Sequence, residues 1–172
     1  MRALVSIVLA AMSTFASADP VCRTNEIQIT VLPFDVRQDF SVPYAGLVDL
    51  AVEDGLVGLV HQTATVKVEG CAAVVGYANP VLYVASELTR SRCAFKTVLE
   101  HELHHVDIYR HALTSLEGRI RAAAAGEPLF DAAWQELNAV DMAQKAFDSP
   151  KEYQNNLTAC GGRIYMLAMH MM

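Results

Sequence analysis

The chain lacks the basic surface that a nucleic-acid-binding protein needs. It has 13 Lys and Arg residues against 19 Asp and Glu residues, a formal net charge of −6. Its basic residues form no cluster with interleaved aromatic residues. Phosphate backbones and anionic membranes are poor partners for such a chain. We therefore expect it to bind no nucleic acid and, after the N-terminal segment is removed, no membrane.

Long apolar runs are also scarce, and the N-terminal one is typical of a secretory signal. Arg2 provides a positive start, residues 3–12 are apolar, and residues 16–18 read Ala-Ser-Ala, a typical cleavage site. No other stretch is long and apolar enough to span a bilayer. We predict a signal peptide at residues 1–18 and a single domain at residues 19–172. The mature protein would be exported, to the periplasm or the extracellular space.

Cysteine is sparse, with four residues in the 172-residue chain. Their wide spacing does not suit a zinc–cysteine knuckle, whereas four cysteines in an exported chain predict two structural disulfides. Three connectivities are possible. One of them, Cys93 to Cys160, would tie the helix predicted below to the C-terminal segment. The four residues are Cys22, Cys71, Cys93 and Cys160.

The chain shows no internal repeat and no low-complexity segment, and its patterns change from strand-like to helical along its length. Alternating apolar residues indicate strands, and apolar residues three or four apart indicate helices. Strands followed by helices predict an α+β domain with a small, mostly antiparallel sheet. The expected strands are 26–34, 63–69, 72–76, 81–86 and 164–172, and the expected helices are 42–53, 93–125 and 129–147.

The most informative segment is residues 101–105, which read HELHH and match the HExxH motif. On an α-helix a step of four residues turns by only about 40° and rises about 6 Å. His101 and His105 would therefore point to the same side and could bind one metal ion. Glu102 would lie about 100° round the helix, within reach of a water on that ion. This is the arrangement of a zinc peptidase with one Zn²⁺ and Glu102 as the general base.

The surrounding residues supply the helix that this motif requires. Apolar residues recur at helical spacing, Ser91 could cap the first turn, and Gly126 with Pro128 would end the helix. Glu102 falls inside the apolar stripe, where an unpaired charge is costly, and a metal with its water would give it a partner. The alternative is that Glu102 pairs with Arg110 and that the histidines are ordinary surface residues.

Residues 98–113, VLEHELHHVDIYRHAL, resemble the core of HExxH zinc peptidases, whose fold is called zincin-like. The chain is more particularly similar to a family of uncharacterised secreted bacterial zinc proteases. The resemblance implies a sheet that precedes the HExxH helix, with an edge strand along the substrate cleft. Residues 81–86 would be that edge strand, to which a peptide would add by strand pairing.

The similarity to that family extends on both sides of the motif, with one departure. The family's downstream motif ends in His-Gly, but this chain has Cys160 where the family has His, and the spacing differs by one residue. The positions that match in order are Cys71, His101, Glu102, His105, Asp107, Ile108, Tyr153, Thr158 and Gly161.

A catalytic zinc site usually has three protein ligands and a water, so one ligand is missing from the motif. If helices 93–125 and 129–147 run antiparallel, the residues after the second helix return to the level of the two motif histidines. We therefore favour Glu152 or Asp148 as the third ligand, with Cys160 as an alternative.

His111 is a further alternative, because it stands ten residues after His101. That is the position of the third ligand in the metzincin signature HExxHxxGxxH. Ile108 occupies the glycine position of the signature, and the helical pattern continues through it. An unbroken helix would leave His111 far from the other two histidines.

These observations predict an exported zinc-dependent peptidase that hydrolyses a peptide or protein substrate by means of a metal-activated water. Asp107 could support a ligand histidine, and Tyr153 could steady the oxyanion, although core packing is the commoner role for a tyrosine. One alternative is a non-catalytic metal-binding or inhibitory exported domain with a zincin-like fold. Another is a disulfide-stabilised interaction module in which the motif is accidental.

Overall fold

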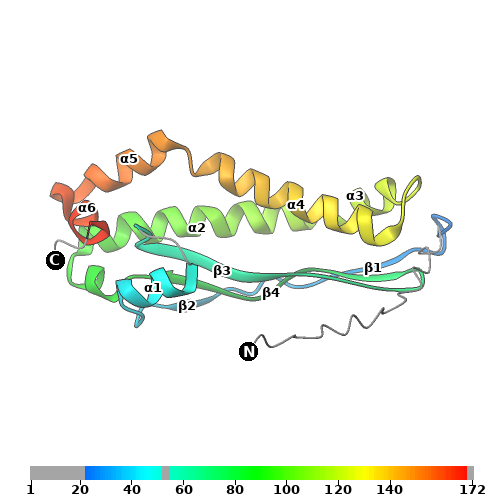
Figure 1. The fold of residues 1–172 in the computed structure, drawn as a ribbon, viewed down its shortest axis with the longest axis horizontal. Helices are drawn as coiled ribbons and strands as arrows, with labels where there is room; N and C mark the ends of the chain where they lie inside the picture. Colours follow the sequence, from blue (N-terminus) through cyan, green and yellow to red (C-terminus); the bar gives the residue numbers. More distant parts are fainter. Residues whose placement is uncertain (1–21, 52–54, 170–172) are drawn as a thin grey trace, which may run out of the picture.

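The computed structural model describes residues 22–51 and 55–169, apart from the side chains of Pro150 and Tyr153. The predicted signal peptide at residues 1–18 therefore lies outside the described residues. The chain forms an α+β fold, with strands in its first half and helices in its second (Figure 1). The elements are β1 (Gln28–Val31), β2 (Arg37–Asp39), α1 (Tyr44–Ala51), β3 (Gly58–Glu69), β4 (Ala72–Val84), a 3₁₀ turn (Ser86–Arg90), α2 (Arg92–Thr114), α3 (Leu116–Ala123), α4 (Leu129–Phe147), α5 (Pro150–Thr158), a second 3₁₀ turn (Ala159–Gly162) and α6 (Arg163–Ala168).

The sheet is built around β4, which has neighbours on both sides. β1 and β2 pair in parallel with successive parts of β4, and β3 forms an antiparallel hairpin with it. The prediction of a mostly antiparallel sheet is therefore wrong, because two of the three strand pairings are parallel. Alternation in a sequence indicates which face each side chain takes, and it carries no information about the direction of the neighbouring strand.

The predicted strands 72–76 and 81–86 are parts of the one long strand β4. A bulge joins them: Asn79 has a φ of 53° before Pro80, and the pairing register with β3 shifts between His61 and Thr63. A bulge accommodates a proline that a regular central strand would not. The assignment of 81–86 as the edge strand is wrong, because Val81 to Tyr83 pair with β2 as well as β3. The strand that borders α2 at an open edge is β3, which pairs only with β4 in the described part of the chain.

The predicted helix 93–125 is divided at Ser115 into α2 and α3. Its start is as predicted, since the Ser91 side chain accepts a hydrogen bond from the Ala94 amide. At the break, Arg119 donates to the Ser115 hydroxyl and to the Ala112 carbonyl, which replaces helical hydrogen bonding. Leu116, the first residue after the break, is completely buried. This burial depends on contacts with distant residues, so the local periodicity of the sequence does not predict the break.

The C-terminal segment is helical, so the predicted strand 164–172 is wrong for its described residues. α6 buries Ile164, Leu167 and Ala168, whose spacing of three and one places them on one helical face. Residues 170–172 lie outside the described part. The predicted helix 129–147 is confirmed with the same bounds, and α1 confirms the described part of the helix expected at 42–53.

The core lies between the sheet and the layer formed by α2 and α4. These two helices run antiparallel above the sheet, and α1 lies at the end of the sheet where β3 begins (Figure 1). The side chains that fill this layer are fully buried and almost entirely apolar, so hydrophobic burial holds the helix pair in place. The largest of them are Tyr77, Leu82, Leu116, Ile120, Leu137 and Ile164.

Two disulfides staple the fold, as the sequence predicts. Cys22 joins Cys71, and Cys93 joins Cys160. The second bridge connects the first turn of α2 to the segment between α5 and α6. Both are compatible with a protein that folds in an oxidising compartment. No helix of the described residues is long and apolar enough to cross a membrane.

We expect that the Cys93→Ser/Cys160→Ser variant loses about 2–4 kcal/mol of unfolding free energy, since the cross-link constrains the unfolded chain. Urea unfolding followed by circular dichroism measures this loss. Wild-type protein unfolded with and without reductant is the control. An unchanged midpoint in the double variant would contradict a stabilising role for this bridge.

Candidate metal centre

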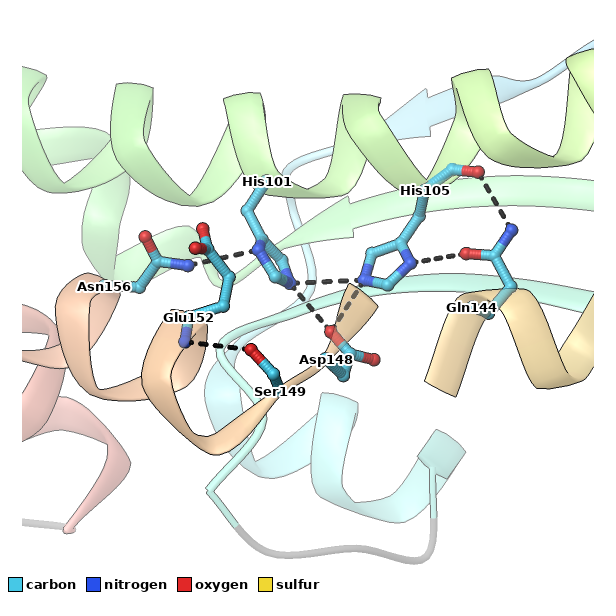
Figure 2. A network of polar contacts seen from close by, with 7 residues as sticks. All are labelled: His101, His105, Gln144, Asp148, Ser149, Glu152 and Asn156. Carbon is cyan, nitrogen blue, oxygen red and sulfur yellow. Dashed lines mark hydrogen bonds and ion pairs between the residues drawn. The ribbon is translucent and has the colours of Figure 1, made fainter. Parts of the chain in front are cut away.

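Three side chains from two parts of the chain converge on one point. His101 Nε2 and His105 Nε2 lie 3.2 Å apart, and each faces the same oxygen of Asp148. That oxygen, Oδ1, is 3.2 Å from His101 Nε2 and 3.0 Å from His105 Nε2. Figure 2 shows the two rings descending from α2 to meet the carboxylate. Among the described residues, these three form a group that could hold a metal ion.

Local sequence explains why Asp148 reaches this point. α4 runs back along α2, and Asp148 is the residue at which it ends. The following Ser149 caps α5, accepting a hydrogen bond from the Glu152 amide, and Pro150 occupies the first turn. The chain therefore turns at Asp148 and leaves its side chain beside the middle of α2.

The structure distinguishes among the predicted third ligands in favour of Asp148. Glu152 lies in the first turn of α5 and is not part of the converging group. Cys160 is bonded to Cys93, so its sulfur is no ligand. His111 is exposed near the end of α2, which continues without a break from the motif, so the metzincin-type position is wrong.

The spacing of the three ligand atoms suits a small divalent ion. A tetrahedral site with metal–ligand distances of about 2.0–2.1 Å has ligand atoms about 3.3 Å apart. The three observed separations of 3.0 to 3.2 Å are close to that edge length. Two imidazoles and one carboxylate leave a position open for water or substrate. The donor set therefore fits a metal in both chemistry and size.

Gln144 fixes the orientation of His105. Its Oε1 lies 2.5 Å from His105 Nδ1, and its Nε2 donates to the His105 carbonyl at 3.1 Å. The amide is buried, so these bonds are shielded from water. With the Nδ1 proton donated to Gln144, the Nε2 lone pair of His105 is directed at the metal point.

Asn156 has the corresponding position beside His101. Its side-chain Nδ2 lies 3.1 Å from His101 Nδ1, on the side of the ring away from Asp148 (Figure 2), and a half-turn of the terminal amide puts Oδ1 in the same place. When the amide oxygen faces the ring, it accepts the Nδ1 proton and leaves Nε2 free to bind a metal. Each ligand histidine thus has an amide partner, one from α4 and one from α5.

Phe147 holds both rings from the side. Its ring stacks on His101 with centroids 4.9 Å apart and meets His105 edge-on at 5.0 Å. The ring centroids of Phe147 and His104 are also 4.2 Å apart, although His104 itself is exposed. Such contacts restrict imidazole rotation, so the metal-binding geometry is preformed.

Glu102 is buried beside the metal point without a hydrogen-bond donor among the described residues. Only 6% of it is exposed, and the part that remains accessible lines the same pocket as His101 and His105. The alternative partner, Arg110, pairs instead with Asp107 on the outer face of α2. A buried carboxylate without a partner is costly, and such groups are typical of functional sites.

The electrostatics of the centre reflect the burial of these charges. Burial raises the pKa of Glu102 to about 7, against the opposing effect of His105 and His101. Burial lowers the pKa of His105, but the Asp148 hydrogen bond and the Glu102 charge outweigh it and leave the pKa raised. Burial also raises the pKa of Asp148, yet hydrogen bonds from both histidines hold it well below its usual range. Binding of a divalent ion would displace the ring protons that face Asp148.

The centre opens into a pocket of about 380 Å³. One wall is the start of β3, the floor is α2, and the other wall is formed by the ends of α4 and the C-terminal helices. No Lys or Arg is among the described residues that line it. The lining residues are Gly55, Leu56, Val57, Gly58, Leu59, Val60, Val98, His101, Glu102, His105, Tyr109, Gln144, Asp148, Asn156, Leu157 and Ile164.

Of the two predicted supporting residues, Asp107 and Tyr153, the structure describes the side chain of Asp107 alone. The Asp107 side chain is 74% exposed and contacts Arg110, so it does not support a ligand histidine. Tyr153 belongs to α5, but its side chain lies outside the described part of the structure. The tyrosine that does line the pocket is Tyr109, whose hydroxyl accepts a hydrogen bond from Gln62.

Sequence reasoning missed the two amides and Phe147. Gln144 carries a usable signal, because it follows Leu137 and Val140 at spacings of seven and four in the buried stripe of α4. A polar residue at a core position calls for a buried partner. Asn156 has no such signal, since it lies in a largely polar helix and its contact with His101 depends on the turn at Ser149.

Comparisons with known protein families, with curated proteins and with solved structures find no match for this chain. They assign no family, so the resemblance of residues 98–113 to zinc peptidases stays a prediction. The chemistry of the protein is therefore inferred from its own side chains.

We expect the protein to bind one divalent ion per chain, and Asp148→Asn to weaken that binding severely. The loss should exceed the roughly 10–100-fold that removal of a ligand's hydrogen-bond partner costs. Calorimetric titration with Zn²⁺ measures it. Glu152→Gln, an acid four residues away and outside the group, is the matched control. Equal affinity in the two variants would remove Asp148 from the ligand set.

The side-chain amide that contacts His101 should also affect the affinity of the centre for Zn²⁺. Asn156→Ala is expected to weaken metal binding by about 10–100-fold, because the His101 ring loses the side-chain amide that orients it. Asn155→Ala, at the exposed neighbouring position of α5, should bind as wild type does. Competition with a chelator of known affinity gives both values, and an identical affinity in the two variants would contradict the orienting role.

Proposed function

We propose that this protein is an exported zinc-dependent peptidase that hydrolyses peptide bonds with Glu102 as the general base. The observation that carries the proposal is a carboxylate without a partner, buried beside three converging metal-ligand atoms in one pocket. Such a carboxylate is unfavourable for folding and useful for moving a proton.

His101, His105 and Asp148 would hold the ion, with Gln144 and Asn156 keeping the rings in place. A bound zinc lowers the pKa of water toward about 7 and polarises a substrate carbonyl. Glu102 would accept the proton that this water loses and later deliver it to the leaving amine.

The wall formed by β3 supports a peptide as the substrate. The backbone of Gly58 to Val60 lines the pocket at the open edge of β3, where an extended peptide could add by strand pairing. A pocket whose described lining has no Lys or Arg offers no cation for a terminal carboxylate. These features favour an internal peptide bond over the C-terminal bond of a substrate.

The two alternatives account for less of the site. A non-catalytic metal-binding domain would need the ligand residues and their amide partners, but would have no use for the unpaired Glu102. In an interaction module with an accidental motif, His101, His105 and Asp148 would have no reason to converge on one point. The disulfides agree with export, because they persist in oxidising compartments.

We expect Glu102→Gln to keep stoichiometric zinc and to lower kcat by about 10²–10⁴-fold, the usual contribution of a general base. Hydrolysis of an unfolded protein substrate and elemental analysis give the two readouts. Glu100→Gln, on the exposed side of α2, is the matched control and should be fully active. Full activity of Glu102→Gln would remove Glu102 as the base.

Zinc-loaded wild-type protein distinguishes the remaining possibilities. Cleavage that a chelator abolishes and added zinc restores supports a peptidase. Tight zinc binding with no cleavage would support the non-catalytic alternative, and no binding would support the interaction module.

A further inference from the structure

Gly58, the first residue of β3, has no conformational reason to be glycine. It is buried, pairs with Val84 in the sheet, and is not among the glycines with positive φ. Its backbone is therefore open to any L residue, and glycine in a strand is destabilising relative to alanine. Some other constraint must account for the missing side chain.

That constraint is the close approach of α2. A Cβ on Gly58 would lie 2.5 Å from Glu102 Oε1 and 2.8 Å from Glu102 Cγ, and 2.6 Å from Val98 Cγ1. Carbon atoms in contact normally stay about 3.5–4.0 Å apart. Val98 is β-branched and has one preferred rotamer in a helix, so it does not readily move aside. The space that a methyl group would fill is occupied by the Glu102 side chain.

We propose that Gly58 is a positioning residue for Glu102: its missing Cβ opens a slot in β3 that holds the Glu102 carboxylate beside the metal-ligand atoms. No hydrogen bond from the described residues fixes this carboxylate, so the slot formed by β3 and Val98 sets its position. The three atoms nearest to a Cβ at position 58 belong to Glu102 and Val98, so Gly58 acts through Glu102 and contacts none of the three metal ligands at this point.

The catalytic consequence rests on the proposed function. A methyl group at position 58 would push the Glu102 carboxylate away from its place, and a displacement of about 1 Å can cost on the order of 100-fold in rate. Gly58→Ala should therefore lower kcat by about 10–100-fold, with zinc stoichiometry unchanged. Gly118→Ala, where a Cβ would meet nothing within 4 Å, should leave kcat unchanged.

A thermal-stability cycle tests the contact without any activity measurement. In chelator-treated protein, Gly58→Ala should lower Tm by about 3–10 °C through overpacking. In a Glu102→Ala background the same change should lower Tm by at most half as much, because two of the three close contacts are gone. Equal shifts in the two backgrounds would overturn the proposal, as would wild-type kcat in Gly58→Ala.

Two further arms keep the outcomes separate. If Gly58→Ala does not fold, the pair Val98→Ala and Val98→Ala/Gly58→Ala relieves the second clash. If Gly58→Ala again lowers kcat by about 10–100-fold in the Val98→Ala background, the positioning role is supported. Equal kcat values in the two variants would overturn it.

If wild-type protein hydrolyses nothing, the proposed function fails, while the Tm cycle still decides whether Gly58 accommodates Glu102.

Discussion

The site depends on the antiparallel packing of α4 against α2. That packing brings the end of α4 beside the middle of α2, where Asp148 meets both motif imidazoles within 3.2 Å. Gln144 contributes to the same contact by bonding to both the ring and the carbonyl of His105. Hydrophobic burial between the helices and the sheet holds the pair together, so helix packing positions the three ligand side chains.

This preformed geometry includes an unfavourable element. Glu102 is buried and accepts no hydrogen bond from the described residues. Gly58 leaves room for the Glu102 side chain, although a glycine stabilises a strand less than a residue with a side chain does. A fold selected for stability alone would replace either residue by an apolar one. The conflict is localised to one pocket, which is the pattern expected where function opposes stability.

Much of the site follows from local sequence, and much of the sheet does not. His101, Glu102 and His105 share a helix whose caps and periodicity are visible in the chain, and the expected helical hairpin favours Asp148 or Glu152 as the third ligand. The parallel pairing of β1 and β2, the break at Ser115 and the helical α6 depend on contacts between distant segments. Asn156 is hidden for the same reason, since the turn after α4 places it.

The Cys93–Cys160 bridge has a consequence for the centre beyond chain stability. α5 follows directly from Asp148 and carries Asn156, and the bridge anchors its far end to the first turn of α2. A metal ion at Asp148 and a disulfide at Cys160 would therefore secure the two ends of one helix to the helix that carries the motif. Because each restrains the same segment, loss of the bridge should weaken metal binding by freeing Asn156 from His101, and loss of the metal should leave that segment less restrained.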